Sequence, residues 1–439
     1  MHREVLIMVC TCDLAGQVRG KGFPARDLKA RASRGVGWTP TNSLITAFGP
    51  IADSPWGPHG DLILAPDPDT EVNVDFGDDS PPERFVLGDL RETDGKPWSC
   101  CPRDFLRRGL HALEREAGLR LHASFEHEFV YTGVQARANS AYSLAGFREQ
   151  GLFGEMLIRS LRGAGLEPDT FMAEYAPRQY EITLGPAPGL AAADRAVILR
   201  ELVRATAQRL DHRAIFSPML DPDGVGNGVH IHFSLRDPNG VAIMHDPAGP
   251  GELSPIAGQF VAGILHHMPM LCALTAPSVI SYQRLTPHRW SAFVNNLGYR
   301  DREAGVRICP VFQVPGAAPL GNQFHLEYRA ADAAASPYLA LGALVWAGLQ
   351  GIRDKLPAPS PTRDEDLSGL SDEDLEQRGL QRLPEFLEDA LQLLERTPQA
   401  RDWLGAPLLD AYLRHKRAEI NYVKHLEPEE QCERYRGVY

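Results

Sequence analysis

Three short segments of the sequence place ionisable side chains two residues apart. They are residues 125–129 (FEHEF), 229–234 (VHIHFS) and 325–329 (HLEYR). Because each segment is short and rich in apolar residues, each predicts a buried β-strand. Residues i and i+2 of a strand point to the same face. The side chains expected to share one face of a sheet are Glu126 with Glu128, His230 with His232 and Ser234, and Glu327 with Arg329.

Carboxylates, imidazoles and a guanidinium on one buried face indicate a functional site rather than a packed core. Buried charge without partners is too costly to serve as filler, whereas such a set suits hard divalent metals and phosphate. Each cluster taken alone has a structural explanation: a satisfied core histidine, a solvated edge strand or a structural ion pair. All three explanations would have to hold at once, so the site is favoured.

The arginines decide between two kinds of site. Two carboxylates with His-x-His would also suit a metal-dependent hydrolase, in which the metal activates water. However, four arginines lie in the same third of the chain as Glu327: Arg284, Arg302, Arg307 and Arg329. Several guanidinium groups are expected where a transferring phosphate must be held and neutralised. The sequence therefore favours phosphoryl transfer.

Composition and charge exclude several classes of protein. The chain has 439 residues, enough for two or three domains, and a net charge of −12. There is no basic run, so nucleic acid is not an expected partner. The apolar run at residues 5–9 is too short for a signal peptide or a membrane span. Seven cysteines without a CxxC pair predict reduced thiols of a cytoplasmic protein rather than a disulfide framework or a zinc site.

The elements that must position these residues predict an α+β fold, because strands and helices do not alternate as βαβ units. We expect two domains, residues 1–97 and 98–439. After this boundary, helix signals begin at Pro102 and end at Gly118. Further expected features are strands near 4–12 and 61–65, helices near 191–210 and 384–424, helix starts at Ser254-Pro255 and Ser336-Pro337, and a surface linker at 357–376.

The order and spacing of six segments resemble the glutamine synthetase family. The segments are SFEHEF (124–129), QYEI (179–182), GNGVHIH (226–232), SYQRLTP (281–287), YRDREAGVRI (299–308) and LEYR through SPYL (326–339). The resemblance implies an N-terminal β-grasp domain and a catalytic domain with a curved antiparallel sheet. It also implies a homo-oligomer, a ring-shaped dodecamer with active sites between subunits. Members of this family make an acyl phosphate from ATP and glutamate, which ammonia or an amine then attacks.

The resemblance also implies a role for each matching residue. Magnesium or manganese would be the metal. The implied metal ligands are Glu126, His230 and Glu327 at one ion and Glu128 and Glu181 at the other. The implied nucleotide contacts are Glu174, His232, Ser234 and Arg307. Arg302 and Arg329 would stabilise the transferring phosphoryl group, and Arg284 and Gly226 would contact the substrate acid.

Four positions depart from the family pattern. Arg195 stands where we expect a third carboxylate of the second metal, so that ion is predicted to bind weakly. Val225 replaces an asparagine that contacts the amino acid. Trp290 and the neutral stretch 38–42, which begins with Trp38, replace acids that attract ammonium. Because both acids are absent, we expect these tryptophans to offer aromatic surface to an organic amine.

The sequence thus predicts a ligase that forms a γ-glutamyl amide from glutamate, or a related acid, and an organic amine. Two alternatives stay open. One is a glutamine synthetase that uses ammonium, and the other is a non-catalytic scaffold or regulator of the same fold. An assay of ADP release with a panel of amines separates them.

Overall fold

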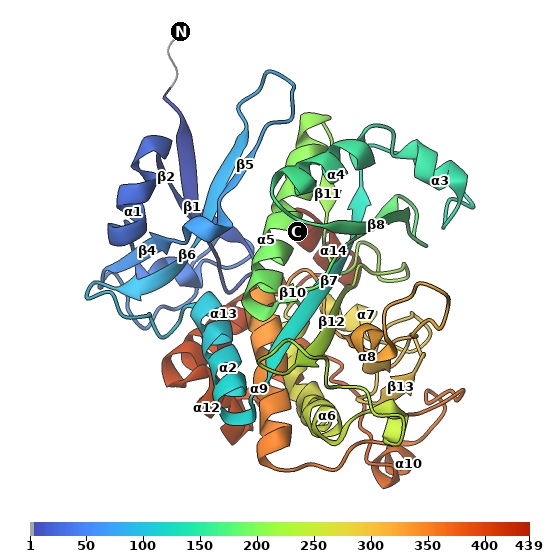
Figure 1. The fold of residues 1–439 in the computed structure, drawn as a ribbon. Coiled ribbons are helices and arrows are strands. Elements are labelled where there is room, and N and C mark those ends of the chain that lie inside the picture. The colour runs from blue at the N-terminus through green and yellow to red at the C-terminus, as the bar shows by residue number, and fades with distance from the viewer. Residues whose placement is uncertain (1–3) are drawn as a thin grey trace.

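The first of two sheets is formed by the N-terminal part of the chain. The structure is a computed structural model that describes residues 4–439, so residues 1–3 lie outside the described part of the chain. The sheet has the order β2-β1-β6-β4-β3, with β5 also paired to β6, and α1 (Leu28–Arg34) packs on it. Its strands are β1 (Leu6–Cys12), β2 (Val18–Pro24), β3 (Val36–Trp38), β4 (Leu62–Pro66), β5 (Val72–Val74) and β6 (Glu83–Glu92). This sheet forms the blue lobe of Figure 1.

The second sheet carries the predicted functional strands. Its order is β13-β14-β15-β12-β7-β9-β8, with β10 and β11 also paired to β7. The strands are β7 (Arg120–Tyr131), β8 (Pro168–Ala173), β9 (Gln179–Leu184), β10 (Ala187–Pro188), β11 (Ala214–Ile215), β12 (Val229–Arg236), β13 (Leu297–Tyr299), β14 (Val306–Ile308) and β15 (Leu326–Tyr328). The described pairs are antiparallel except for β13 with β14. The predicted α+β class and the three predicted strands are confirmed.

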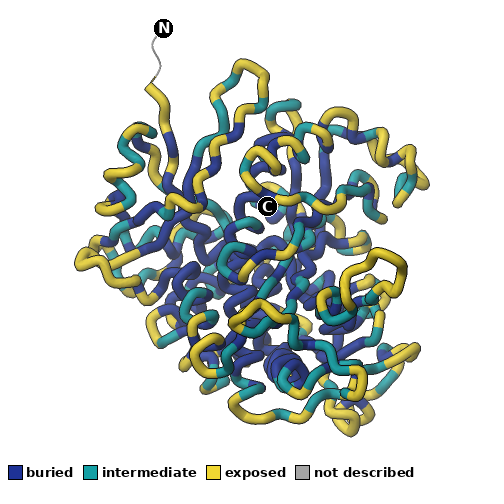
Figure 2. Tube along the Cα trace, in the orientation of Figure 1, coloured by how far each residue is buried: buried dark blue, intermediate teal, exposed yellow. Residues whose placement is uncertain are grey.

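Long apolar helices cover one face of this sheet. The long helices of the core are α2 (Pro102–Ala117), α5 (Gly189–Arg209), α6 (Pro255–Thr275) and α9 (Pro337–Arg353). Helix α5 packs on β7, and α9 packs on α2, α5 and α6. Because these helices bury most of their residues, the centre of the molecule is dark in Figure 2 and the exposed residues lie in peripheral loops.

The remaining helices lie in the connections and the C-terminal part, and all of them except α13 are shorter than these four. They are α3 (Leu144–Glu149), α4 (Phe153–Gly163), α7 (Ser281–Arg284), α8 (Leu320–Gln323), α10 (Asp372–Gln377), α11 (Leu387–Arg396), α12 (Pro398–Leu404), α13 (Ala406–Val423) and α14 (Pro428–Arg436). The predicted helical tail is therefore three helices, α11 to α13. The predicted linker at 357–376 is irregular until α10 begins.

The predicted helix ends are largely correct. Gly118 ends α2 with a left-handed φ of 64°, a conformation that glycine adopts without a Cβ clash. The Ser254 hydroxyl caps α6 by accepting from the backbone N–H of Ala257 at 3.3 Å. At α9 the proline stands at the first helical position as predicted, but Ser336 makes no capping hydrogen bond through its side chain.

One helix is long and apolar enough to cross a membrane. It is α6, whose 18-residue window has a mean hydropathy of 1.3. Because 83% of that window is buried inside the protein, α6 is a core helix. It packs against α9.

Candidate functional site

All fourteen residues that the sequence predicts for the site line one cavity. The cavity has a volume of about 1250 Å³ and lies on the face of the second sheet away from α5. The predicted residues along its wall are Glu126, Glu128, Glu174, Glu181, Gly226, His230, His232, Ser234, Arg284, Trp290, Arg302, Arg307, Glu327 and Arg329. The chain brings them together from eight segments that are distant in sequence.

The pleat and register of the sheet explain this convergence. On β7, Phe125 and Phe129 point to the buried helix face, so Glu126 and Glu128 must point to the other side. Pairing then sets their neighbours, because His230 lies opposite Glu126 and Glu181 lies opposite Glu128. On the other side of β12, Glu327 pairs with both His232 and Arg307.

One end of the cavity, which we call the arginine end, holds carboxylates that already have cationic or imidazole partners. Glu327 is buried and accepts from Arg307 Nη1 at 2.8 Å and from Arg329 Nη1. Glu126 lies 3.3 Å from His230 Nδ1 and 3.0 Å from His232 Nε2. His230 Nδ1 also lies 3.6 Å from Glu327, so it links the two carboxylates.

These contacts keep the arginine-end carboxylates ionised. Burial opposes ionisation of Glu327, but the Arg329 charge lowers its pKa to about 2. Burial likewise opposes ionisation of Glu126, but its hydrogen bonds with His230 and His232 hold its pKa well below the usual range. Burial and the nearby Arg329 charge lower the pKa of His230 to about 4. His230 is therefore neutral near pH 7, as a metal ligand must be.

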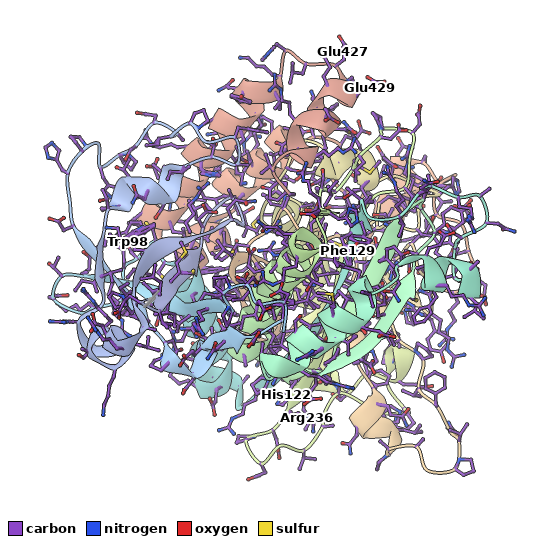
Figure 3. All side chains as sticks on the ribbon, turned by 90° about the horizontal axis from the view of Figure 1, so that it is seen from above. Trp98, His122, Phe129, Arg236, Glu427 and Glu429 are labelled. Atoms are coloured by element: carbon purple, nitrogen blue, oxygen red, sulfur yellow. The ribbon has the colours of Figure 1, made fainter. Side chains whose placement is uncertain are left out.

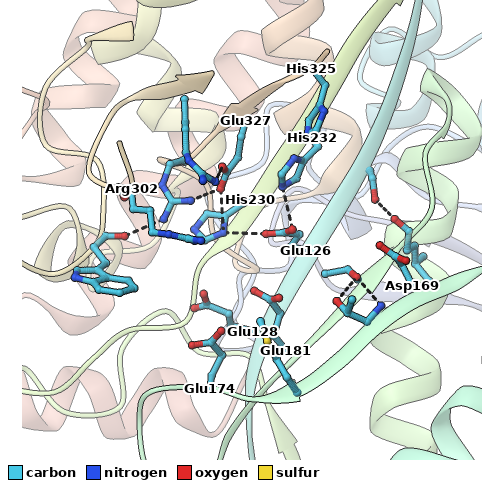
Figure 4. A pocket seen from close by; sticks show the side chains of 18 of the residues that line it. Glu126, Glu128, Asp169, Glu174, Glu181, His230, His232, Arg302, His325 and Glu327 are labelled. Atoms are coloured by element: carbon cyan, nitrogen blue, oxygen red, sulfur yellow. Dashed lines mark hydrogen bonds and ion pairs between the residues drawn. The ribbon is translucent and has the colours of Figure 1, made fainter. Parts of the chain in front are cut away.

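The other end, which we call the carboxylate end, holds Glu128, Glu174 and Glu181. Figure 4 shows their carboxylates gathered together, apart from the arginines. Burial raises the pKa of Glu128 to about 7, and the charge of Glu174 adds to the shift. Burial and the charges of Glu126, Glu128 and Glu174 raise the pKa of Glu181 well above its usual value. Like charges held this close need a cation or protons to neutralise them.

The structure corrects the argument about Arg195. Arg195 lies on α5 and is not among the described residues that line the cavity. The adjacent Asp194 accepts from Arg103 at 2.9 Å and from Tyr338 at 2.6 Å, so it is committed elsewhere. The expectation that Arg195 weakens the second metal is therefore wrong. Glu174, whose nucleotide role stays a prediction, places a third carboxylate beside Glu128 and Glu181.

The predicted acid-binding corner is tightly built. A Cβ on Gly226 would lie 2.6 Å from the Pro218 carbonyl and 2.8 Å from the Arg284 side chain, so only glycine fits there. Arg284 is buried and donates to Ser291 Oγ at 3.0 Å and to the Ala331 carbonyl at 2.7 Å. Its Nε has no partner in the structure, which leaves one buried donor available for an anion.

Aromatic side chains line the mouth of the cavity. Trp290, Tyr142 and Tyr175 line it and are more than half exposed. The guanidinium of Arg302 lies 6.0 Å from the Trp290 ring centroid, and the Tyr142 hydroxyl donates to Glu174 at 2.8 Å. Trp38 behaves differently, because it is buried in the core of the N-terminal lobe. The prediction that Trp38 offers aromatic surface is wrong.

Sequence reasoning missed several cavity residues. His122 lies on the same face as Glu126 and Glu128, so the alternation along β7 was signal enough to find it. Figure 3 shows His122 beside Arg236 at one end of the sheet and far from Glu427 and Glu429, with Phe129 in the interior and Trp98 in the N-terminal lobe. Tyr142 and Tyr175 lie in loops with no such pattern, so only the tertiary structure reveals them.

The donor sets fit divalent metals. One ligand atom from each of Glu126, Glu181 and His230 lies within 4.8 Å of the others, and the same holds for Glu126, His232 and Glu327. Carboxylate oxygens with few imidazoles suit magnesium or manganese.

Comparison with known proteins identifies the family models and the relatives that match this chain. A family model described as the glutamine synthetase N-terminal domain matches residues 2–98, and one described as the glutamine synthetase catalytic domain matches residues 99–435. The chain is 32% identical to a γ-glutamylpolyamine synthetase of Streptomyces coelicolor, covering 100% of this chain and 94% of that protein. It is 31% identical to a glutamine synthetase of Pyrococcus furiosus, covering 91% and 86%.

Solved structures agree. One described as a novel glutamine synthase homolog has a TM-score of 0.92 and 42% identity, covering 100% of this chain and 99% of that one. A GmaS/ADP complex has a TM-score of 0.81 and 26% identity, covering 96% and 94%.

Proposed function

Because this chain belongs to the glutamine synthetase family of ATP-dependent carbon–nitrogen ligases, we propose that it joins an organic amine to the side-chain carboxyl of glutamate or a related acid. The reaction would pass through an acyl phosphate. The γ-phosphoryl group of ATP goes to the carboxylate, the amine nitrogen attacks the carbonyl carbon, and phosphate leaves. The observation that carries the proposal is a cavity with arginines at one end and exposed aromatic rings at its mouth.

The arginine end fits the phosphoryl group. Arg307 and Arg302 line the cavity, and Arg307 Nε is buried without a partner. Guanidinium groups fixed before the reaction stabilise the charge that develops on a transferring phosphate. Arg329 donates to Glu327, to the Arg302 carbonyl and to the Trp290 carbonyl, so its first task is to hold this end together. His232 and Ser234 are the proposed nucleotide contacts farther along β12.

Glu126, His230 and Glu327 would hold one divalent ion, and Glu128, Glu174 and Glu181 would hold the other. When bound, such ions neutralise phosphate and substrate carboxylate charge. Without them burial, with a smaller contribution from the charge of Glu174, raises the pKa of Glu128 to about 7. The donor types suit magnesium or manganese but do not choose between them.

The substrate acid would bind at the Arg284 corner. Its α-carboxylate would accept from Arg284 Nε, a donor that has no hydrogen-bond partner among residues 4–439. Val225 lines the same corner and is exposed to the cavity, where its side chain offers no hydrogen bond. The acid is therefore glutamate or a close relative that needs no amide contact at this position.

The mouth favours an organic amine over ammonium. Ammonium is small and strongly hydrated, whereas an amine with an apolar body gains roughly 0.8 kcal/mol for each buried methylene. Three or four buried methylenes would favour the amine by about 2–3 kcal/mol, on the order of a hundredfold. Trp290 and Tyr142 provide rings for that body.

The rival function is glutamine synthesis from ammonium, and the Pyrococcus furiosus relative is a glutamine synthetase. The hydrolase alternative is excluded by family membership. The scaffold alternative loses one of its three supports, since Arg195 is not among the described residues that line the cavity. We also propose the ring-shaped dodecamer and a cytoplasmic location, which the family resemblance suggests. Light scattering after gel filtration would test the ring.

The deciding experiment is steady-state ADP release with glutamate, ATP and either ammonium or a series of alkyl, aryl and polyamine substrates. We expect kcat/KM for at least one organic amine to exceed that for ammonium by on the order of a hundredfold. Mass spectrometry of the product should show the corresponding γ-glutamyl amide. Equal or better use of ammonium would replace the proposal with glutamine synthesis.

A further inference from the structure

A cysteine and two histidines meet at one end of the cavity. Cys309 follows β14, His325 precedes β15 and His232 lies on β12. One ligand atom from each lies within 4.8 Å of the other two. Cys309 Sγ is 3.8 Å from His232 Nδ1, and the two imidazole ring centroids are 5.2 Å apart. Figure 4 shows His232 and His325 side by side, beyond Glu126.

This donor set differs from the carboxylate sets elsewhere in the cavity. A thiolate with two imidazoles is the set that zinc and similar thiophilic cations prefer, whereas magnesium prefers oxygen. Zinc bonds of about 2.3 Å to sulfur and about 2.0 Å to nitrogen, at tetrahedral angles, put sulfur and nitrogen roughly 3.5 Å apart. The 3.8 Å separation of Cys309 and His232 is close to that value.

Each histidine has an oxygen atom close to its second ring nitrogen. His325 Nδ1 lies 2.6 Å from the Gln323 carbonyl oxygen, which leaves Nε2 as the possible ligand. His232 Nε2 lies 3.0 Å from Glu126 Oε1, which leaves Nδ1 toward Cys309. Such carbonyl and carboxylate partners fix the tautomer and orientation of metal-bound histidines.

The sheet holds the three residues in place. Ile308 pairs with Leu326, and just beyond this pair the Cys309 N–H donates to the His325 carbonyl at 3.3 Å. His232 lies on the neighbouring strand, opposite Glu327. Because His232 lies on β12 and Cys309 and His325 directly flank the paired strands β14 and β15, the donors are positioned before any ion binds.

We propose that His232, Cys309 and His325 form a binding site for a thiophilic divalent cation of the zinc type. Both histidines line the cavity, so a fourth coordination position faces its interior. The site is separate from the two proposed magnesium or manganese sites, although Glu126 contacts both groups of residues. It does not depend on which amine the enzyme uses.

The test is cobalt binding to the full chain in saturating magnesium, which occupies the carboxylate ligands. We expect one Co²⁺ per subunit, with a sulfur-to-cobalt absorption band that Zn²⁺ abolishes on displacement. Cys309→Ser should remove the band. His325→Gln should weaken Co²⁺ binding by at least about tenfold, because removing even a hydrogen-bond partner of a metal ligand can lower metal affinity by that much.

Cys432→Ser is the matched control, because Cys432 is also buried but contacts Gln283 at 3.3 Å, outside the cavity. It should keep the band. A wild-type protein without the band, or a band unchanged in Cys309→Ser, would overturn the proposal. If Cys309→Ser does not fold, the same loss of affinity in His325→Gln decides the question. None of these readouts uses ligase activity, so the outcome is independent of the proposed function.

Discussion

The two ends of the cavity use the same residue type in opposite ways. At the arginine end, Glu327 has two guanidinium partners and a pKa of about 2. At the carboxylate end, Glu128 has one backbone donor, Gly228 N–H at 2.6 Å, and a pKa of about 7. Glu327 is buried, Glu128 is partly buried, and both lie on one sheet. The difference teaches that burial alone does not set the role of a carboxylate, because its charged neighbours do.

The contrast has a functional meaning. The arginine end is balanced without an ion and is therefore organised before substrate binds, which suits electrostatic stabilisation of a phosphoryl group. The carboxylate end is unbalanced and stores repulsion that a divalent ion relieves. Metal binding should therefore stabilise the carboxylate end far more than the arginine end.

The largest expected effect is that of Glu327→Gln. This change leaves Arg307 and Arg329 without their anionic partner, and breaking a buried ion pair costs about 3 kcal/mol or more of unfolding free energy. ADP release should fall by roughly a hundredfold to a thousandfold, the size seen when a charge-stabilising group is lost. Urea unfolding and steady-state kinetics measure both. Glu373→Gln, on the exposed start of α10, is the control and should change neither. Unchanged stability would mean that the arginine end is not an interlocked charge network.

The opposite stability change is expected for Glu128→Gln. At pH 8 and without metal, the substitution removes a buried negative charge beside Glu174 and Glu181, so the protein should gain about 1–3 kcal/mol. Activity should still fall, because a metal ligand is lost. Unfolding curves with and without magnesium measure this, and magnesium should stabilise the wild type more than the variant. A metal-free variant less stable than wild type would contradict the comparison.

The pH dependence follows from the raised pKa of Glu128. In the unfolded chain this group has a pKa near 4.5, and in the folded protein near 7. The folded state binds the proton more tightly, so the contribution to stability is full below pH 4.5 and is lost as pH rises through 7. Metal-free protein should therefore lose stability between about pH 5 and 8 at this residue.

Manganese binding should release a proton near pH 6 and progressively less above pH 8. Calorimetry in buffers of different ionisation heat measures this proton release. Glu128→Gln should reduce it, whereas Glu327→Gln should not, since Glu327 is already ionised at these pH values. Equal proton release in both variants would show that the two ends are not electrostatically distinct.

The smallest effect is expected at Trp290, which belongs to neither the arginine end nor the carboxylate end of the cavity. Trp290→Ala removes the ring but keeps the backbone carbonyl that accepts from Arg329 at 3.2 Å. We expect kcat/KM for an organic amine to fall about tenfold, equivalent to about 1.4 kcal/mol, with little change for ammonium. Phe386→Ala is the control, because Phe386 is similarly exposed but does not line the cavity. An equal loss with both nucleophiles would indicate that the ring only covers apolar surface.

Local pattern in the sequence determined much of this site. Side chains two residues apart in a strand share a face, and this rule placed Glu126, His230 and Glu327 on one face of the sheet. The register of β7, β12 and β15 bears this out. The same rule applied further along β7 would have found His122. The role assigned to each residue, and the domain boundary near residue 97, stay predictions.

Only the tertiary structure decided which side chains become neighbours of the site residues. Arg195 was misjudged because a position on a helix does not tell which face meets the cavity, and α5 turns it away. Trp38 was misjudged because a short strand buries alternate residues, and its face meets the core. Glu174, Cys309 and His325 acquire their neighbours from chain segments that pair across the sheet. Periodicity is a local property of the backbone and can be predicted from sequence, whereas the charge around a buried group depends on residues hundreds of positions away.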